Sequence, residues 1–267
     1  MFVSTHGIVS RPTTSAYGTL TTAWIAATGE TDLTILGALN TLESDLTTYG
    51  LTAKMKALYP FVGGTAAKHK YNFMDARDLD AAFRLTFSGG LTHDSNGIKG
   101  NGTNGYYDTK LNPSTQFSLS TGGCGFVATN ENIQTAIDFG AFESGVNYRF
   151  QLTVRDTGDS LSAAALSNAY YSTTNTNSSG FFGITRPAND NTNFYTIINT
   201  NNYATADSYY EPNSVITGFA FNINNGSVIT AYSNRRQSFA CFGEGITTIQ
   251  AQNLRTAVNT FNTTLAR

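Results

Sequence analysis

The chain has 267 residues, of which 40% are hydrophobic, 12% aromatic and only 13% charged, and its formal net charge is −2. The hydrophobic share is sufficient for a large core, but the charge pattern offers neither a basic stripe for nucleic acid nor a Lys/Arg cluster for a membrane surface. No stretch approaches the ~20 consecutive apolar residues of a membrane-spanning helix. Residues 1–18 also lack the basic start and apolar run of a secretory signal, so we expect no export signal and no membrane insertion.

Two helices are predicted before residue 50. The first covers Thr19–Thr28 and carries the only tryptophan. The second begins after Thr31-Asp32, which are N-cap residue types, and ends at Gly50, since glycine favours the left-handed conformation that follows a helix. Leucines at three- and four-residue steps place one apolar stripe on this second helix: Leu33, Leu36, Leu39, Leu42 and Leu46. Residues 51–58 are expected to add a further helical turn before Pro60 ends it.

The leucine stripe must pack against an apolar partner, either the rest of the chain or a second subunit. Residues 1–58 are therefore predicted to be an N-terminal arm and helical docking region. We assign its oligomer or docking contacts to Trp24, Leu33, Leu36 and Leu42.

From residue 59 the pattern changes to short apolar or alternating runs, separated by clusters of Gly, Asn, Ser, Thr and Asp. Many short strands with turn residues about every ten positions predict an antiparallel sandwich or barrel. Asn224-Asn225-Gly226 is the clearest hairpin signal, because Asn-Gly accepts positive φ angles. A last helix is predicted over residues 248–265, capped by Thr247-Thr248, with an apolar stripe formed by Ile249, Leu254, Val258, Phe261 and Leu265. Residues 59–267 are thus predicted to be one β-sandwich closed by a C-terminal helix.

Catalytic patterns are not visible in the sequence. Jelly-roll glucanases carry paired carboxylates at alternate strand positions, so that acid and base flank one bond. The nearest match, Glu43-Ser44-Asp45, falls in a predicted helix, and no G-x-S-x-G elbow occurs. His6, His69 and His93 are scattered without partners at metal or triad spacing. We therefore assign no catalytic residue and no metal ligand, and expect no enzyme.

The remaining charged and sulfur-containing groups favour structural roles. Asp75, Asp78 and Asp80 alternate with Arg77 and Arg84, which predicts an ion-paired turn. Cys124 and Cys241 lie in apolar strand-like runs and are predicted to be buried free thiols. A disulfide between them would require an oxidising compartment, and this alternative stays open.

Two ligand classes are compatible with the polar turns. Asp94-Ser95-Asn96-Gly97 and Asn189-Asp190-Asn191 are rich in oxygen ligands for calcium, although Asx residues also favour turns through local hydrogen bonds. No cofactor is assigned, and calcium stays an open alternative. Sugars stack on aromatic rings and bond to amides, and tyrosines near polar loops are the candidate glycan-binding residues: Tyr106, Tyr107, Tyr170, Tyr171, Tyr209 and Tyr210.

Residues 51–114 contain the runs KMKALYPFVGG, RDLDAAFRLTFSGG and NGTNGYYDTKLNP, and residues 241–267 read CFGEGITTIQAQNLRTAVNTFNTTLAR. These segments resemble a module of tailed-bacteriophage virion proteins, of the tail-fibre or head-decoration type, that carries a concanavalin A-like (LamG-like) jelly-roll sandwich. Residues 120–235 carry no match. The resemblance implies a mainly β fold, a place in the virion and contacts with other virion proteins.

Taken together, these patterns predict a homo-oligomeric fibre or decoration subunit that displays a lectin-like sandwich, with host cell-surface polysaccharide as its ligand. The alternatives from other classes are a soluble polysaccharide-active enzyme and a stand-alone carbohydrate-binding module on the same fold. Since such sandwiches host many activities, the fold by itself does not separate these alternatives.

Overall fold

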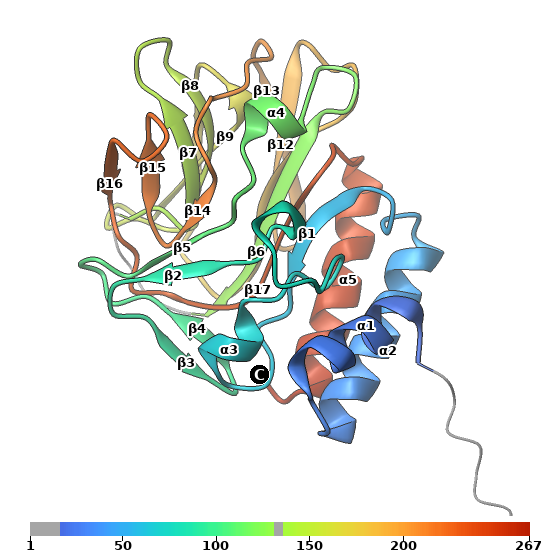
Figure 1. Ribbon diagram of the computed structural model, residues 1–267. Helices are drawn as coiled ribbons and strands as arrows, with labels where there is room; N and C mark the ends of the chain where they lie inside the picture. The colour runs from blue at the N-terminus through green and yellow to red at the C-terminus, as the bar shows by residue number, and fades with distance from the viewer. Residues whose placement is uncertain (1–16, 131–135) are drawn as a thin grey trace, which may run out of the picture.

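The computed structural model describes residues 17–130 and 136–267. Within them the chain forms two stacked β-sheets, with a layer of helices over the outer face of one sheet (Figure 1). This arrangement confirms the predicted mainly β sandwich with an N-terminal helical region and a C-terminal helix. The predicted arm up to residue 16 and His6 lie outside the described residues. Over the described part of the chain, no helix combines the length and apolar character needed to cross a bilayer.

The first sheet, here called the helix-covered sheet, lies between the helices and the second sheet (Figure 1). Its strands follow the order β13-β12-β11-β6-β17-β4-β3, and β1 also pairs with β17. Every pairing in it is antiparallel. The strands are β1 (Met55–Tyr59), β3 (Thr92–Asp94), β4 (Gly97–Lys99), β6 (Gly123–Asn130), β11 (Gly180–Arg186), β12 (Asn193–Ile198), β13 (Asn201–Ala206) and β17 (Arg236–Gly243).

The second sheet, here called the open sheet, has no helical layer of this kind (Figure 1). Its order is β10-β9-β8-β7-β14-β5-β2, while β15 pairs with β16 and runs parallel to β7. The strands are β2 (Thr86–Ser88), β5 (Tyr106–Asp108), β7 (Phe139–Glu143), β8 (Tyr148–Thr153), β9 (Ser160–Ser167), β10 (Tyr171–Thr174), β14 (Thr217–Gly218), β15 (Phe221–Ile223) and β16 (Val228–Thr230). The predicted hairpin joins β15 and β16, and Asn224, Asn225 and Gly226 all have positive φ.

The helical layer consists of α1 (Thr19–Thr28), α2 (Leu33–Thr48) and α5 (Thr248–Thr264). As predicted, Asp32 caps α2 by accepting bonds from the backbone N–H groups of Thr34 and Ile35. Thr247 caps α5 in a capping box with Gln250. The short elements α3 (Ala66–His69), η1 (Asp80–Ala82) and α4 (Pro113–Gln116) lie in the connections.

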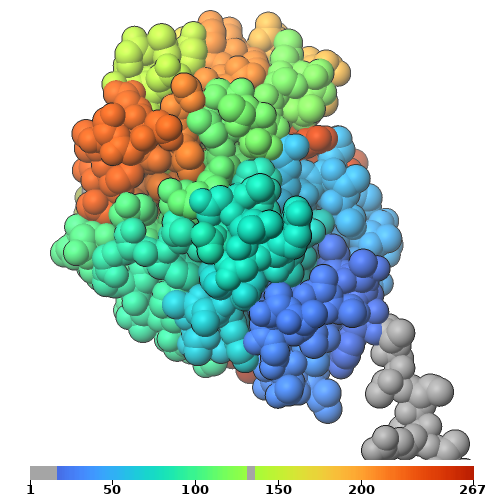
Figure 2. All heavy atoms as spheres, viewed as in Figure 1, coloured from blue at the N-terminus to red at the C-terminus, as the bar shows by residue number. Residues whose placement is uncertain are grey.

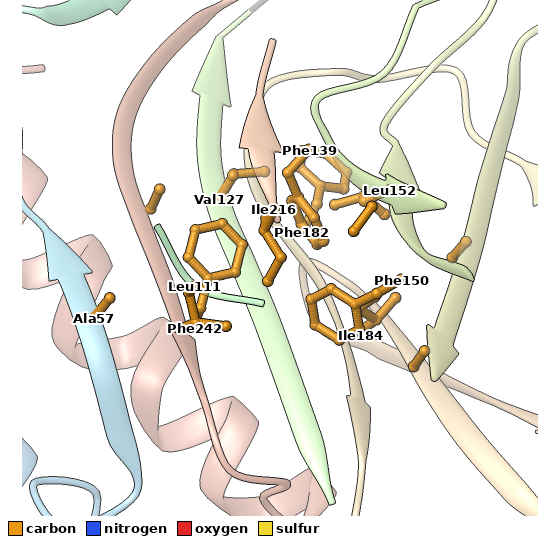
Figure 3. Close-up of a cluster of buried hydrophobic side chains, with 14 of the residues drawn as sticks. Ala57, Leu111, Val127, Phe139, Phe150, Leu152, Phe182, Ile184, Ile216 and Phe242 are labelled. Carbon is orange, nitrogen blue, oxygen red and sulfur yellow. The ribbon is translucent and has the colours of Figure 1, made fainter. Parts of the chain in front are cut away.

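Two hydrophobic cores lie on opposite faces of the helix-covered sheet. The core between the sheets includes Val127, Phe139, Phe150, Phe182 and Phe242 (Figure 3). The core under the helices receives the alternate residues of the same strands, among them Phe126, Phe181 and Phe239. Since side chains alternate along a strand, both faces of this sheet are apolar, and β6 and β17 are buried over almost their whole length.

Residues 51–58 form no further helix, contrary to the prediction. Met55–Tyr59 is strand β1, which pairs with the distant β17. A register shift between Met55 and Ala57 puts Met55 and Leu58 into the same core under the helices. The bulge therefore gives this strand buried side chains three residues apart, a spacing that is otherwise typical of a helix. This spacing explains why the sequence pattern predicts a helix here.

The four predicted docking residues occupy different environments. Trp24, Leu36 and Leu42 are buried in the chain's own core under the helices, so they pack internally instead of forming a free docking surface. Leu33 is 76% exposed. The expected boundary between residues 58 and 59 falls inside β1.

The predicted ion-paired turn is confirmed: Arg77 bonds to Asp75, and Arg84 bonds to both Asp78 and Asp80. Cys124 and Cys241 are free and buried. Burial raises the pKa of both thiols, which keeps them protonated near neutral pH.

Candidate glycan-binding surface

The β7–β8 hairpin directs an aromatic ring and a cation onto the outer face of the open sheet. Phe139 and Ala141 of β7 enter the core between the sheets, so Phe142 points outward by strand alternation. Phe142 lies opposite Arg149 of β8 in the antiparallel register. Phe221 of β15 stacks on Phe142 with ring centroids 5.2 Å apart and planes 7° from parallel. The outer face thus carries a small aromatic cluster.

Arg149 connects this cluster to an exposed tyrosine. Its guanidinium carbon lies 4.1 Å from the ring centroid of Phe142 and 5.3 Å from that of Tyr170. Tyr170 is 56% exposed, which leaves much of its ring available to a ligand. We call Phe142, Arg149 and Tyr170 the aromatic platform. Partial burial lowers the pKa of Arg149, and the Tyr170 hydroxyl opposes this shift; the guanidinium stays charged at neutral pH.

A second aromatic pair lies at the start of β8, on the opposite side of the strand from Arg149. Tyr148, the neighbour of Arg149, stacks on Tyr210 with ring centroids 4.5 Å apart and planes 12° from parallel. The backbone N–H of Tyr210 donates to the carbonyl of Leu166, which fixes the loop after β13 against β9. We call Tyr148 and Tyr210 the tyrosine stack. Both rings are partly exposed.

Amide side chains and carboxylates hold the loops around these rings. The Nδ2 of Asn147 donates to the carbonyl of Asn168 at 2.6 Å. The backbone N–H of Asn213 donates to the carboxylate of Glu143 at 2.9 Å, and Asn112 donates to the Asn213 side chain. In Figure 2 the β7–β8 turn and residues 207–230 form a continuous part of the surface at the upper left. The rings are thus set in an amide-rich rim that also contains the Glu143 carboxylate.

The six predicted glycan-binding tyrosines are placed unequally. Tyr170 and Tyr210 both lie against the start of β8. Tyr106 is partly exposed beside Tyr232, at a centroid distance of 6.4 Å. Tyr171 stacks on Tyr203 at the edge of the core.

One of the six is fully buried, and another packs partly against the core. Tyr107 is fully buried, and its hydroxyl donates to Gln237, so it cannot contact a surface glycan and its assignment is corrected. It points inward because its neighbour on β5, Tyr106, points outward. Tyr209 packs against the core and donates to Glu211, which together with burial raises its pKa.

Sequence reasoning missed Phe142, Tyr148 and Arg149. The signal was present, since a tight hairpin over residues 139–153 would have put Phe142 opposite Arg149.

The two oxygen-rich turns use their side chains internally. Asp94 Oδ1 accepts from the Asn96 backbone N–H and from Arg236. Asp190 Oδ1 accepts from the backbone N–H groups of Thr192 and Asn193. No group of three or more His, Cys, Asp or Glu side chains suited to a metal ion occurs in residues 17–130 and 136–267. Calcium binding therefore stays an untested alternative.

A groove of about 530 Å³ lies at the opposite end of the molecule from the β7–β8 turn, between the start of α2, residues 62–68 and the end of α5. Its charged residues are already paired, since Lys68 donates to Glu30 at 2.9 Å. Glu30 also accepts from the backbone N–H groups of Thr31 and Asp32. These bonds give the groove a structural role as the joint between α2 and the loop before α3.

No protein-family model matches the chain, and no curated protein matches it. Among solved structures, it is similar to a mutant Trypanosoma rangeli sialidase displaying trans-sialidase activity, with 8% identity and a TM-score of 0.52 over 85% of this chain and 39% of the sialidase. It is also similar to domain 4 of AbnA, an extracellular GH43 arabinanase from Geobacillus stearothermophilus solved with arabinotriose, with 14% identity and a TM-score of 0.47 over 76% of this chain and 98% of that domain. At these identities the likeness shows the lectin-like β-sandwich fold alone.

Proposed function

We propose that the chain is a glycan-binding subunit of a tailed-bacteriophage particle, which displays its lectin-like sandwich to bacterial surface polysaccharide. The aromatic platform carries the binding part of this proposal. The resemblance of residues 51–114 and 241–267 to virion proteins carries the location in the particle. The proposed action is binding without catalysis.

The platform can recognise a sugar by two kinds of contact. The exposed ring of Tyr170 offers a flat apolar surface to the C–H face of a pyranose, and neighbouring amides offer donors and acceptors to its hydroxyls. Sites that combine aromatic surface with a few placed polar groups are typical for small ligands.

Arg149 suggests the charge of the preferred sugar. Three of its five N–H groups are bound, two to Asn147 and one to Gln151. The other two make no hydrogen bond to any described residue and can donate to a sugar carboxylate. A charge-assisted bond of this kind is about twice as strong as a neutral one. We therefore expect acidic polysaccharides to bind more tightly than neutral ones.

Binding to bacterial surface oligosaccharides, measured on a glycan array and by calorimetry, tests the proposal. Tyr170→Ala should weaken binding roughly five- to tenfold, from the lost ring contact. Tyr49→Ala, in the helical layer, is the matched control and should leave affinity unchanged. Absence of binding to any acidic or neutral glycan, with and without calcium, would refute the glycan role.

Arg149→Gln separates the two sugar classes. The substitution should weaken the binding of acidic oligosaccharides and reduce the salt dependence of that binding. The affinity for neutral oligosaccharides should stay nearly unchanged. Equal losses for both classes would contradict the expected preference.

Two further measurements separate the alternatives. Mass spectrometry of purified particles should detect the chain if it is a virion subunit. Incubation with bound polysaccharide should release no new reducing ends, and their appearance would favour the enzyme alternative.

A further inference from the structure

Strand β13 forms an unprotected edge of the helix-covered sheet. It is the last strand in the sheet order, and it reads NNYATA over Asn201–Ala206. Four of its six residues are exposed, at positions 201, 202, 204 and 206. Natural edge strands are normally blunted by charged residues, proline or bulges, because free edges pair with other chains. β13 has no charged residue and no proline, and its register with β12 is regular.

The register identifies which backbone groups of β13 face outward. The N–H of Asp207 donates to the carbonyl of Thr192 at 2.7 Å, one step beyond the ladder. Because hydrogen-bonded and non-hydrogen-bonded pairs alternate in an antiparallel ladder, Thr205, Tyr203 and Asn201 bond to β12. The backbone groups of Asn202, Ala204 and Ala206 then point away from the sheet. No backbone–backbone hydrogen bond from these three to another part of the described chain is present outside the ladder, and the Asn202 side chain accepts a bond from Gln252 of α5.

We propose that β13 pairs antiparallel with β13 of a second copy of this chain, about a two-fold axis at Ala204. Hydrogen-bonded pairs must then join the outward-facing residues of both strands, so Ala204 pairs with Ala204 of the second copy and Asn202 pairs with Ala206. The same patch is used on both copies, as closed two-fold symmetry requires.

The side chains fit this register. The residues at the centre of the seam are Asn and Ala, which are small and uncharged, so no like charges meet. Asp207 of each copy lies opposite Asn201 of the other, which also avoids repulsion. The adjacent edge of the open sheet, β10, reads YSTT and is likewise uncharged. Tyr171 of β10 stacks on Tyr203 of β13 at 5.9 Å, so the two edges form one side of the sandwich.

The helical layer leaves room for the second copy. α5 contacts β11 and β12, and the two β12 strands of the dimer lie three strand spacings apart, about 14 Å. α5 reaches the edge strand through one side chain, since Gln252 donates to the Thr200 carbonyl and to Asn202 Oδ1. Because the helix itself lies over β12 and β11, the two α5 helices are separated by more than one helix diameter of about 10–12 Å. This leaves the paired sheets continuous beneath two separate helical layers.

Cysteine crosslinking tests the register. In Ala204→Cys the two thiols belong to directly paired residues with Cα atoms about 5.5 Å apart, which is within disulfide range. In the control Ala206→Cys the two equivalent Cα atoms are four residues out of register, about 13 Å. Mild oxidation should therefore crosslink the first variant and not the second, and the native cysteines are buried and do not compete. Equal crosslinking of both variants, or of neither, would overturn the proposal.

Light scattering on the full chain tests the dimer itself. The native protein should have twice the monomer mass, and Ala204→Pro should be monomeric with an unchanged circular dichroism spectrum, because proline removes an N–H that only the second copy uses. Its melting temperature should fall only by the contribution of dimer formation. Ala204→Val keeps the N–H and should stay dimeric. A native protein that is monomeric at all concentrations would refute the pairing and leave the proposed glycan binding intact.

Discussion

At the scale of single residues, the half-buried Arg267 is held mainly by backbone carbonyls. The guanidinium of Arg267 donates to the carbonyls of Pro60, Phe61, Ser95 and Ser238, and to the side chain of Asn262. All five donors are used, which ties the end of α5 to loops of the sandwich. Burial lowers the pKa of Arg267 to about 10, so it stays charged at neutral pH.

His69 should make folding sensitive to acid. Its Nδ1 lies 3.0 Å from Nδ1 of His93, and its Nε2 is buried without a partner. Burial, His93 and Arg267 lower its pKa to about 3, against an opposing effect of Asp94. In the unfolded chain the pKa is about 6.5, so between these values the unfolded state binds more protons. Stability is therefore complete above about pH 6.5 and is lost as pH falls toward 3.

Urea unfolding at pH 7.5 and pH 5 measures this effect. The native protein should lose about 2 kcal/mol from His69 over this interval. His69→Asn keeps a polar group near His93 and removes the titrating imidazole, so this variant should lose less unfolding free energy over the same pH interval. An equal loss in both proteins would assign the acid sensitivity to other groups.

At the scale of elements, one helix caps its neighbour. Gly18, the N-cap of α1, has no side chain that could accept hydrogen bonds from the first turn. The side chain of Glu43 in α2 accepts them instead. The Glu43 carboxylate accepts from the backbone N–H groups of Leu20 and Thr21 and from the Thr21 hydroxyl. A carboxylate at a helix N-terminus also interacts favourably with the helix dipole. This contact fixes α1 on α2.

Two substitutions test this capping. Glu43→Ala should cost about 1 kcal/mol of unfolding free energy, as for loss of an N-cap. Gly18→Ser introduces a better N-cap residue and should nevertheless destabilise, because a Cβ there would lie 2.3 Å from the Glu43 carboxylate. In the Glu43→Ala background the serine should become neutral or stabilising, and additive costs would argue against a direct contact.

Only the side chains on the buried face of α5 should contribute to the stability of the protein. Leu254 and Phe261 are buried, and the Phe261 ring lies 6.4 Å from that of Phe239 in β17. Ile249, expected on the same stripe, is 73% exposed. Leu254→Ala or Phe261→Ala should cost roughly 2–5 kcal/mol, and Ile249→Ala should change stability by less than about 0.5 kcal/mol. Denaturant titrations of the three variants check this, and similar losses in all three would contradict it.

At the scale of the whole molecule, the helices and the sandwich share one sheet. The helix-covered sheet contributes Phe126, Phe181 and Phe239 to the core under the helices and Phe182 and Phe242 to the core between the sheets. Loss of the helices would expose its whole apolar outer face. The helical layer is therefore part of the folding unit and not an appended arm.

A two-probe unfolding experiment checks this unity. The fluorescence of Trp24, the only tryptophan, reports on α1, while far-ultraviolet circular dichroism is sensitive to the strands as well. The two urea transitions should coincide, as expected for one cooperative unit. A Trp24 transition that precedes the loss of strand signal would show that the helices unfold independently.

The sequence by itself determined the elements whose signals are local. The caps at Asp32 and Thr247, the leucine spacing of α2 and the Asn-Gly turn act within a few residues, and from them the helices, one hairpin and the sandwich class could be predicted. Only the tertiary structure decided the identity of β1, β9 and β13. β9 reads SLSAAALS, which is dominated by Ala and Ser, and β13 reads NNYATA, in which only Tyr203 and Thr205 favour strands. β1 depends on a partner strand roughly two thirds of the chain length away. It also decided which rings face solvent, because adjacent strand residues point to opposite faces and the sequence does not tell which face another layer covers.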